Sequence, residues 1–309
     1  MNGIQKLAGC ILSINSKPSE KTEKLLLKRR ARMIRNKTVS SVSIGMKKTI
    51  ALFQSENALI QKAKPGEYTI KVANTFEERE EVFKLGYQVY REKGYVDQNP
   101  NEWLIRSYDA NEETVILIVQ DQNKKIVGSV TLVFEENCKL PSEKMYRDEI
   151  KSIKNEGHRI AEISRLIVHP DYRNSKEVLL LLFNYLAIYT YRVKKYSCLI
   201  VQVNPRHISY YKLLLKFKEV GNQKISPIVN NAPAILLSLS TDTYKYEMEN
   251  LKGNNILNKK ERSLYPHFLK SEQEKLVVQY LKNQVKPISQ AEKIYFGFSE
   301  SGISKAVCI

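Results

Sequence analysis

The sequence predicts an α/β domain whose sheet has a parallel core, on the basis of three observations. From Tyr68 onward, short apolar strands alternate with helices, the order typical of such a sheet. The β-rich runs 114–121 and 125–135 flank a polar turn, which predicts a hairpin. Between 159 and 203, a strand, a long apolar helix and a second apolar strand follow one another, which predicts two neighbouring buried strands.

The remaining elements of the domain follow from local periodicity. Residues 68–73 alternate as in a short strand, and residues 76–94 repeat apolar side chains at helical spacing. A helical stretch near 143–153 precedes the strand 159–168. The helix 178–193 and the strand 198–203 are apolar nearly throughout, so we expect both to be buried.

After Leu239 the composition changes. Residues 243–265 have the polar composition of a connector, and residues 271–283 predict an amphipathic helix near the end of the chain. The closing segment 294–299 is apolar enough to pack back onto the domain, and we expect it to seal the core.

Length and composition set the broad class. The 309 residues suffice for one domain of about 170 to 200 residues with extensions. Charged residues make up 27% and hydrophobic residues 42%, and no run of about 18 uncharged apolar residues is present. The four cysteines are scattered, without the close pairs of a zinc site or a disulfide framework, so we expect free thiols and a cytoplasmic protein.

The excess positive charge is concentrated in an N-terminal arm, residues 1–64. This arm has fourteen Lys and Arg residues against three Glu, a net charge of +11 out of +17 for the chain. Residues 21–35 predict a short basic amphipathic helix within a poorly ordered segment. The arm could bind anionic lipid headgroups at the inner membrane, bind an acidic carrier protein, or have no specific partner. Nucleic acid is a disfavoured partner, since no aromatic residues interleave with the charges.

Four motifs occur in order along the central region: EISRL (162–166), HPDYR (169–173), NPRH (204–207) and the pair Tyr210–Tyr211. Together they resemble bacterial N-acyl amino acid synthases, which are GNAT-fold enzymes related to acyl-homoserine-lactone synthases. The resemblance extends over roughly 68–239. It implies a GNAT acyltransferase fold, a central mixed sheet flanked by helices, over 65–245, followed by a helical C-terminal extension, 246–309.

The resemblance also implies where an acyl thioester binds: between the strands 160–168 and 198–204, which splay apart. The turn 171–176 becomes the phosphate site, with Arg173, Asn174 and Lys176 as phosphopantetheine-binding residues at a helix N-terminus. Asn174 and Glu177 have the spacing of a capping pair. The turn has no glycine for close approach to a pyrophosphate, which favours acyl carrier protein over coenzyme A as the donor.

Three residues are candidates for proton transfer. Glu162 matches the family position for a base or for orienting the amine; its alternative is a salt bridge to Arg165 or Arg79. Tyr211, seven residues after Asn204, matches the GNAT tyrosine that protonates the leaving thiolate, although a packing role is equally open. His207 is a general base or only a helix-cap or phosphate contact.

The substrate-binding candidates come from the same motifs and from polar positions of the related synthases. Arg165 pairs with either the amino acid's carboxylate or an internal acid. Asn204 is expected to hold the pantetheine amides. Trp103 covers the acyl chain or packs in the core. The full set of substrate-binding candidates is Arg79, Trp103, Asp109, Ser164, Arg165, Asn204 and Arg206.

Other chemistries have no motif here. The sequence has no nucleophile elbow, metal-ligand spacing, Walker loop or dinucleotide fingerprint, so we expect direct transfer without a bound metal or cofactor. The predicted function is transfer of a long-chain fatty acyl group from acyl carrier protein to the α-amine of an amino acid. The alternatives are an acyl-homoserine-lactone-type synthase that uses S-adenosylmethionine and a catalytically degenerate GNAT module that binds lipid or carrier.

Overall fold

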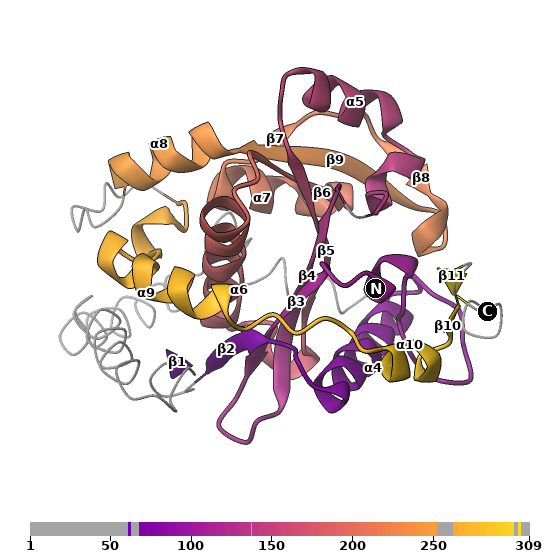
Figure 1. The fold of residues 1–309 in the computed structure, drawn as a ribbon. Helices are drawn as coiled ribbons and strands as arrows, with labels where there is room; N and C mark the ends of the chain where they lie inside the picture. The colour runs from indigo at the N-terminus through magenta and orange to yellow at the C-terminus, as the bar shows by residue number, and fades with distance from the viewer. Residues whose placement is uncertain (1–60, 63–67, 137, 252–261, 300–301, 304–309) are drawn as a thin grey trace, which may run out of the picture.

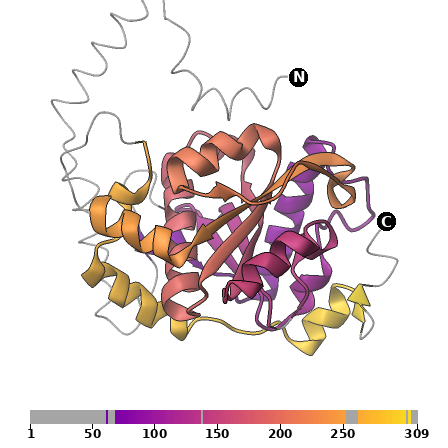
Figure 2. The same cartoon turned by 90° about the horizontal axis from the view of Figure 1, so that it is seen from above.

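A computed structural model of the chain describes residues 61–62, 68–136, 138–251, 262–299 and 302–303. The predicted basic helix at 21–35 lies outside these residues. The described part is a mixed sheet between two layers of helices (Figures 1 and 2). None of its helices is both long and apolar enough to cross a membrane.

The main sheet has the strand order β1-β2-β3-β4-β5-β6-β9-β7, and the short β8 pairs with β9. Its strands are β1 (Gln61–Lys62), β2 (Thr69–Val72), β3 (Val115–Gln120), β4 (Ile126–Phe134), β5 (Ile160–Val168), β6 (Cys198–Val203), β7 (Lys218–Glu219), β8 (Lys224–Ser226) and β9 (Ala232–Ser240). The β3–β4 hairpin confirms the prediction. The expected parallel core is wrong in extent, because β5 and β6 form the one parallel pair in the described sheet; hairpins and returning strands make the other pairs antiparallel.

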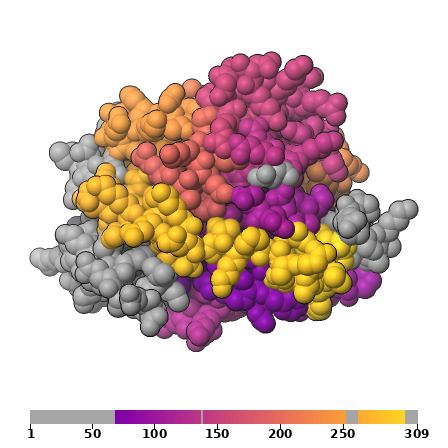
Figure 3. All heavy atoms as spheres, in the orientation of Figure 1, coloured from indigo at the N-terminus to yellow at the C-terminus, as the bar shows by residue number. Residues whose placement is uncertain are grey.

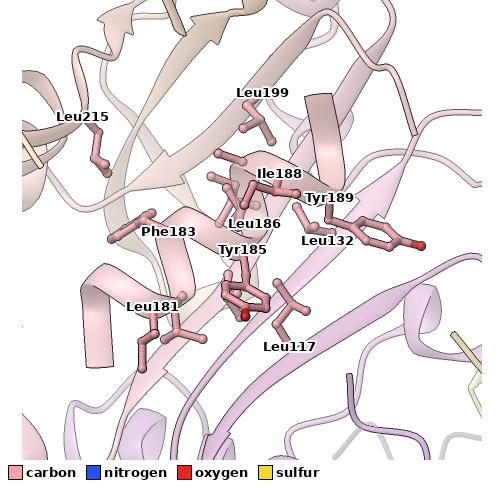
Figure 4. Packing of buried hydrophobic residues seen from close by; sticks show 14 of the residues in the cluster. Leu117, Leu132, Leu181, Phe183, Tyr185, Leu186, Ile188, Tyr189, Leu199 and Leu215 are labelled. Carbon is pink, nitrogen blue, oxygen red and sulfur yellow. The ribbon is translucent and has the colours of Figure 1, made fainter. Parts of the chain in front are cut away.

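One face of the sheet is covered by α6 (Lys176–Ile188), the π-helical turn that continues it (Tyr189–Val193), α7 (Ile208–Leu215), α8 (Thr241–Leu251) and α9 (Ser271–Lys282). We call it the α6 face. The core here is apolar, and its fully buried residues include Leu117, Leu132 and Leu199 (Figure 4). Leu182 is also fully buried. Gly128 permits the close approach of α6 to β4, because a Cβ there would lie 2.6 Å from Val178 Cγ1.

The opposite face, called the α4 face below, is covered by α4 (Phe76–Glu92) and α5 (Arg147–Asn155). Thr75 begins α4 with a capping box to Glu78. Short 3-10 turns connect to the sheet at Ser107–Ala110 and Pro141–Lys144. The two helices cover different parts of the face, and α4 also contacts the C-terminal segment.

The C-terminal segment runs from α9 along the outside of the domain to α10 (Gln290–Tyr295) and the small hairpin β10 (Phe298–Ser299) and β11 (Gly302–Ile303). Figure 3 shows it as a yellow band crossing toward the indigo α4 region. Phe296 and Phe298 are buried against α4, as the sequence predicts for 294–299. The polar connector expected at 243–265 is wrong in its first part, since α8 occupies 241–251 and buries Tyr244 and Met248, one helical turn apart.

Candidate active site

The parallel strands β5 and β6 pair over only part of their length. Their register runs from Ile160–Cys198 to Ile163–Val201, and no further pair forms although β5 continues to Val168 and β6 to Val203. We call the space between these unpaired ends the strand opening. It lies where the resemblance implies that an acyl thioester binds, because unpaired strand edges leave backbone N–H and C=O groups for an amide-containing ligand.

A β-bulge in β5 lies at the same point. The register with β4 shifts between Ser129–Ile167 and Thr131–Ser164, and Arg165 has a φ of 44°, in the left-handed region. The extra residue interrupts the alternation of side chains, so the Ser164 and Arg165 side chains both reach the α4 face. The bulge therefore concentrates polar side chains beside the strand opening.

Glu162 lies one residue before the last pair of β5 with β6, and its carboxylate is buried on the α4 face. It accepts hydrogen bonds from the Ser142 backbone N–H (2.9 Å) and hydroxyl (2.7 Å). Burial raises the pKa of Glu162 to about 8, although the Ser142 hydrogen bonds oppose the shift. The alternative for Glu162, a salt bridge to Arg165 or Arg79, is not formed, because these arginines pair with Asp109 and Glu292. A carboxylate with this pKa is matched to taking a proton from an α-amine near neutral pH.

Arg165 pairs with an internal acid. Its terminal nitrogens donate to both Asp109 carboxylate oxygens, the Leu104 carbonyl (2.8 Å) and the Thr131 hydroxyl (3.0 Å). The Arg106 backbone N–H also donates to Asp109. This buried pair ties the loop before β3 to the bulge. It also leaves no terminal nitrogen of Arg165 for the bidentate contact with a substrate carboxylate that was the other interpretation.

Ser164 is hydrogen-bonded to the Tyr108 hydroxyl at 2.8 Å, and burial raises the pKa of Tyr108 to about 12. The structure thus brings four predicted site residues, Glu162, Ser164, Arg165 and Asp109, onto one face. Their partners Ser142, Tyr108 and Thr131 were missed, since no local pattern links them to β5. These seven residues are called the buried polar patch below.

A cluster of basic residues lies near the ends of β5 and β6. Lys93, after α4, has its pKa lowered by burial and by repulsion from Arg173 and Arg206. Arg206 donates to the Asn204 side-chain oxygen (3.0 Å) and to the Tyr95 hydroxyl. Burial, with repulsion from Lys93 and Arg206, lowers the pKa of His207 to about 4, so its imidazole is neutral and only weakly basic at pH 7. Lys93 is the member of this cluster that sequence reasoning missed.

The predicted phosphate turn, 171–176, leads into α6 as expected, but the N-cap residue of α6 is not the predicted one. Ser175 is the N-cap and accepts a hydrogen bond from the Val178 N–H, so the proposed Asn174–Glu177 capping pair is wrong. The 3-10 turn Pro170–Tyr172 continues to Ser175, and the helix can begin only after it. Asn174 and Lys176 are exposed, while Arg173 forms an ion pair with Glu92.

Tyr211 is buried in α7 with its ring against Phe183 and Phe217. Burial, with a smaller contribution from Tyr90, raises its pKa, so the hydroxyl stays protonated at neutral pH. Both the acid role and the packing role remain compatible with this position. The side-chain oxygen of Asn204 caps the turn Pro205–His207, and its amide nitrogen has no partner among the described residues.

Arg79 and Trp103 lie apart from the buried polar patch. Arg79 forms an ion pair with Glu292 and donates to the Lys286 carbonyl at 2.7 Å. Trp103 packs against Tyr295 and Phe296. Both residues therefore contact the C-terminal segment, and their predicted substrate roles stay predictions.

Three other features of the described chain were candidates for a site: a cavity, possible metal ligands and the cysteine thiols. A cavity of about 720 Å³ lies near the start of β6, lined by Cys198, His158 and residues of α5 and β9, at the end away from the strand opening. No group of three or more potential metal ligands occurs among the described residues. Burial raises the pKa of the Cys138 thiol to about 11 and that of Cys198 to about 12, which leaves both as poor nucleophiles.

Comparison with known proteins gives one family match and several structural similarities. The FeeM structure, an N-acyl amino acid synthase from uncultured soil microbes, is 19% identical, with 58% of this chain and 93% of that chain covered and a TM-score of 0.49. The acyl-homoserine-lactone synthase LasI is 16% identical, with 58% of this chain and 93% of that chain covered and a TM-score of 0.43. The spermidine N-acetyltransferase SpeG from Vibrio cholerae is 14% identical, with 58% of this chain and 96% of that chain covered and a TM-score of 0.39. No curated protein matches the chain.

The family of the chain is shown by a match to a family model. The model described as N-acyl amino acid synthase FeeM matches residues 81–240, which include β3 to β6, the bulge and the whole strand opening. This range is more than half of the 309 residues. The chain therefore belongs to the FeeM family of N-acyl amino acid synthases, and is an acyltransferase.

Proposed function

We propose that the protein transfers a long-chain fatty acyl group from acyl carrier protein to the α-amine of an amino acid. The observation that carries the proposal is Glu162, a buried carboxylate whose pKa of about 8 is suited to deprotonating an amine, beside the strand opening. Membership of the FeeM family supports the same reaction class.

In the proposed reaction, the acyl thioester enters the strand opening and the amino acid approaches from the α4 face. The amine nitrogen attacks the thioester carbonyl carbon, and ionised Glu162 accepts a proton from the nitrogen. The tetrahedral intermediate collapses with formation of the C–N amide bond and cleavage of the C–S bond. Tyr211 protonates the leaving thiolate and regains a proton from solvent, while Glu162 releases its proton to solvent, so the products are an N-acyl amino acid and a free thiol.

Acyl carrier protein is the proposed donor because of the charge around the strand opening. Lys93, Arg173 and Arg206 form a basic cluster there, and the turn 171–176 has no glycine. A single phosphodiester on a carrier needs cations more than it needs close backbone approach, whereas a pyrophosphate of coenzyme A benefits from both. The basic arm, residues 1–64, adds positive charge that would favour an acidic carrier or the inner membrane.

The test uses the purified full chain with C12 to C18 acyl carrier proteins, the matching acyl-coenzyme A thioesters and the twenty amino acids, with mass spectrometry of the products. We expect one N-acyl amino acid, formed faster from the carrier. Equal rates from coenzyme A would contradict the donor assignment. Lactone release from S-adenosylmethionine, or binding of the carrier without any product, would contradict the proposed reaction.

A further inference from the structure

Gln202 occupies the first position of β6 beyond its last pair with β5. Cys198 and Ile200, on the same side of β6, pack in the cluster under α5 on the α4 face. Since side chains alternate along a strand, Gln202 points to the α4 face as well. The next step of the β5–β6 register would set Gln202 opposite Ser164, so its carboxamide lies across the strand opening from the buried polar patch.

The side-chain amide nitrogen of Gln202 has no partner among the described residues. This nitrogen, Nε2, is buried. A buried amide without a hydrogen-bond partner is costly, and native proteins rarely leave one. An acceptor oxygen therefore fits at this point of the α4 face.

A second unpartnered donor lies in the same region. The terminal nitrogens of Arg165 are fully used by Asp109, Leu104 and Thr131, but its Nε is buried and has no acceptor within the described part of the chain. Both donors belong to residues adjacent to, or opposite, Ser164. Two buried N–H groups on neighbouring strand positions, one of them on a cation, suit an oxygen ligand that carries negative charge.

We propose that Gln202, together with the Arg165 Nε, binds the carboxylate of the amino acid that accepts the acyl group. The inference rests on the proposed function, because it assigns the other end of the molecule whose amine faces Glu162. Glu162 and Ser164 are two residues apart on one face, about 7 Å along the strand. The amine and carboxylate of an α-amino acid are separated by a single carbon, and a hydrogen bond of about 2.9 Å at each end spans that interval.

The experiment compares an amino acid with the matching amine that lacks the carboxylate, for example tyrosine and tyramine. The full-length protein and its Gln202→Leu variant, of similar side-chain volume, are assayed for kcat/KM with both acceptors, and amino acid binding is measured separately by calorimetry without donor. Gln223→Leu, the same change at an exposed position, is the matched control. Thermal unfolding of each variant establishes that it is folded.

We expect Gln202→Leu to lower the preference for the amino acid over the amine by about 10- to 100-fold, the effect typical of a hydrogen bond to a charged group. Its affinity for the amino acid should fall by a similar factor, whereas Gln223→Leu should change neither quantity. An unchanged preference would overturn the inference, as would an equal loss with both acceptors, which would instead indicate a contact with the thioester carbonyl.

The two proposals fail in different ways. If the wild-type protein binds an amino acid through Gln202 but acylates none, the proposed function fails and the carboxylate site stands. If the wild-type protein acylates an amino acid and Gln202→Leu keeps full selectivity, the reaction stands and the carboxylate site fails. Absence of amino acid binding to the wild-type protein in both assays also contradicts the carboxylate site.

Discussion

The two faces of the central sheet differ in what they bury. The α6 face buries an almost wholly apolar cluster in which Leu117, Leu182 and Leu199 are completely inaccessible. The α4 face buries Glu162, Arg165 and Asp109 as well, at 2%, 6% and 5% exposure. Burying ionisable groups opposes folding unless they are paired, so the apolar face must supply stability while the other face holds the proposed base, Glu162. Side-chain alternation thus separates an apolar face from a face with buried ionisable groups in one sheet, and the bulge at Arg165 is the local exception that adds a polar side chain to the second face.

The largest effect is expected from the α4 face. Replacing Glu162 by Gln removes the proposed base with little change in shape and should lower kcat/KM by about 10²- to 10⁴-fold. In the wild-type protein kcat/KM should rise with pH through an apparent pKa near 8, because the carboxylate must be ionised to accept a proton. Steady-state rates from pH 6 to 9 test both points. Glu272→Gln, at an exposed position of α9, is the control, and a rate for Glu162→Gln within threefold of wild type would contradict the assignment.

Breaking the buried ion pair should cost stability, in addition to removing the proposed carboxylate contact of the Arg165 Nε. Arg165→Met leaves the Asp109 carboxylate buried without its guanidinium and should lower the free energy of unfolding by about 3–5 kcal/mol. Chemical denaturation measures the change. Glu219→Gln, which breaks the exposed pair with Lys212, should cost less than about 1 kcal/mol. Similar losses in the two variants would show that the Arg165–Asp109 pair is not desolvated in solution.

A cavity on the α6 face should cost stability without altering the ionisation of Glu162. Leu182→Ala removes a fully buried side chain between α6 and β4 and should lower the free energy of unfolding by about 2–5 kcal/mol. The pH dependence of kcat/KM should keep its midpoint near 8, because the Glu162 environment is on the other face. A shifted midpoint in this variant would mean that the two faces are coupled.

The smallest expected effect is a pH dependence of stability. The folded-state pKa of Glu162 is raised from its ordinary value of 4.5 to about 8, so the folded protein holds a proton that the unfolded chain has lost. Its contribution to stability is fully present below pH 4.5 and is lost as pH rises through 8. Between pH 6 and 8 the wild-type protein should lose about 2 kcal/mol more than Glu162→Gln, which thermal or urea unfolding at several pH values can resolve. Parallel pH curves would imply that Glu162 is ionised throughout.

Much of the sheet could be predicted because most of its strands coincide with local apolar runs in the sequence. The β3–β4 hairpin and the unit from β5 through α6 to β6 follow from periodicity and turn residues alone. The sequence order also predicts an acyl-transfer region at the strand ends, which carry the polar residues of EISRL and NPRH. Family resemblance added the expectation that the two strands part.

Side-chain partners could not be predicted in the same way. Glu162 accepts a hydrogen bond from Ser142, while Arg165 and Arg79 form ion pairs with Asp109 and Glu292. Each of these contacts depends on how segments far apart in sequence pack together. The bulge could not be predicted either, because the residue with the left-handed conformation is Arg165 and not a glycine, which would have indicated it. The α8 helix was missed because only Tyr244 and Met248 of its residues are buried, a stripe too narrow to stand out from a polar segment.

The C-terminal segment has a consequence for biosynthesis. Arg79 is near the start of the described domain and Glu292 near its end, yet they form an ion pair, and Phe296 packs directly against Phe83 of α4. Until residues 286–298 have been synthesised, the outer side of α4 is therefore uncovered on the nascent chain. The aromatic packing around Phe83 is therefore expected to form late in biosynthesis, after the strands of the central sheet have been synthesised.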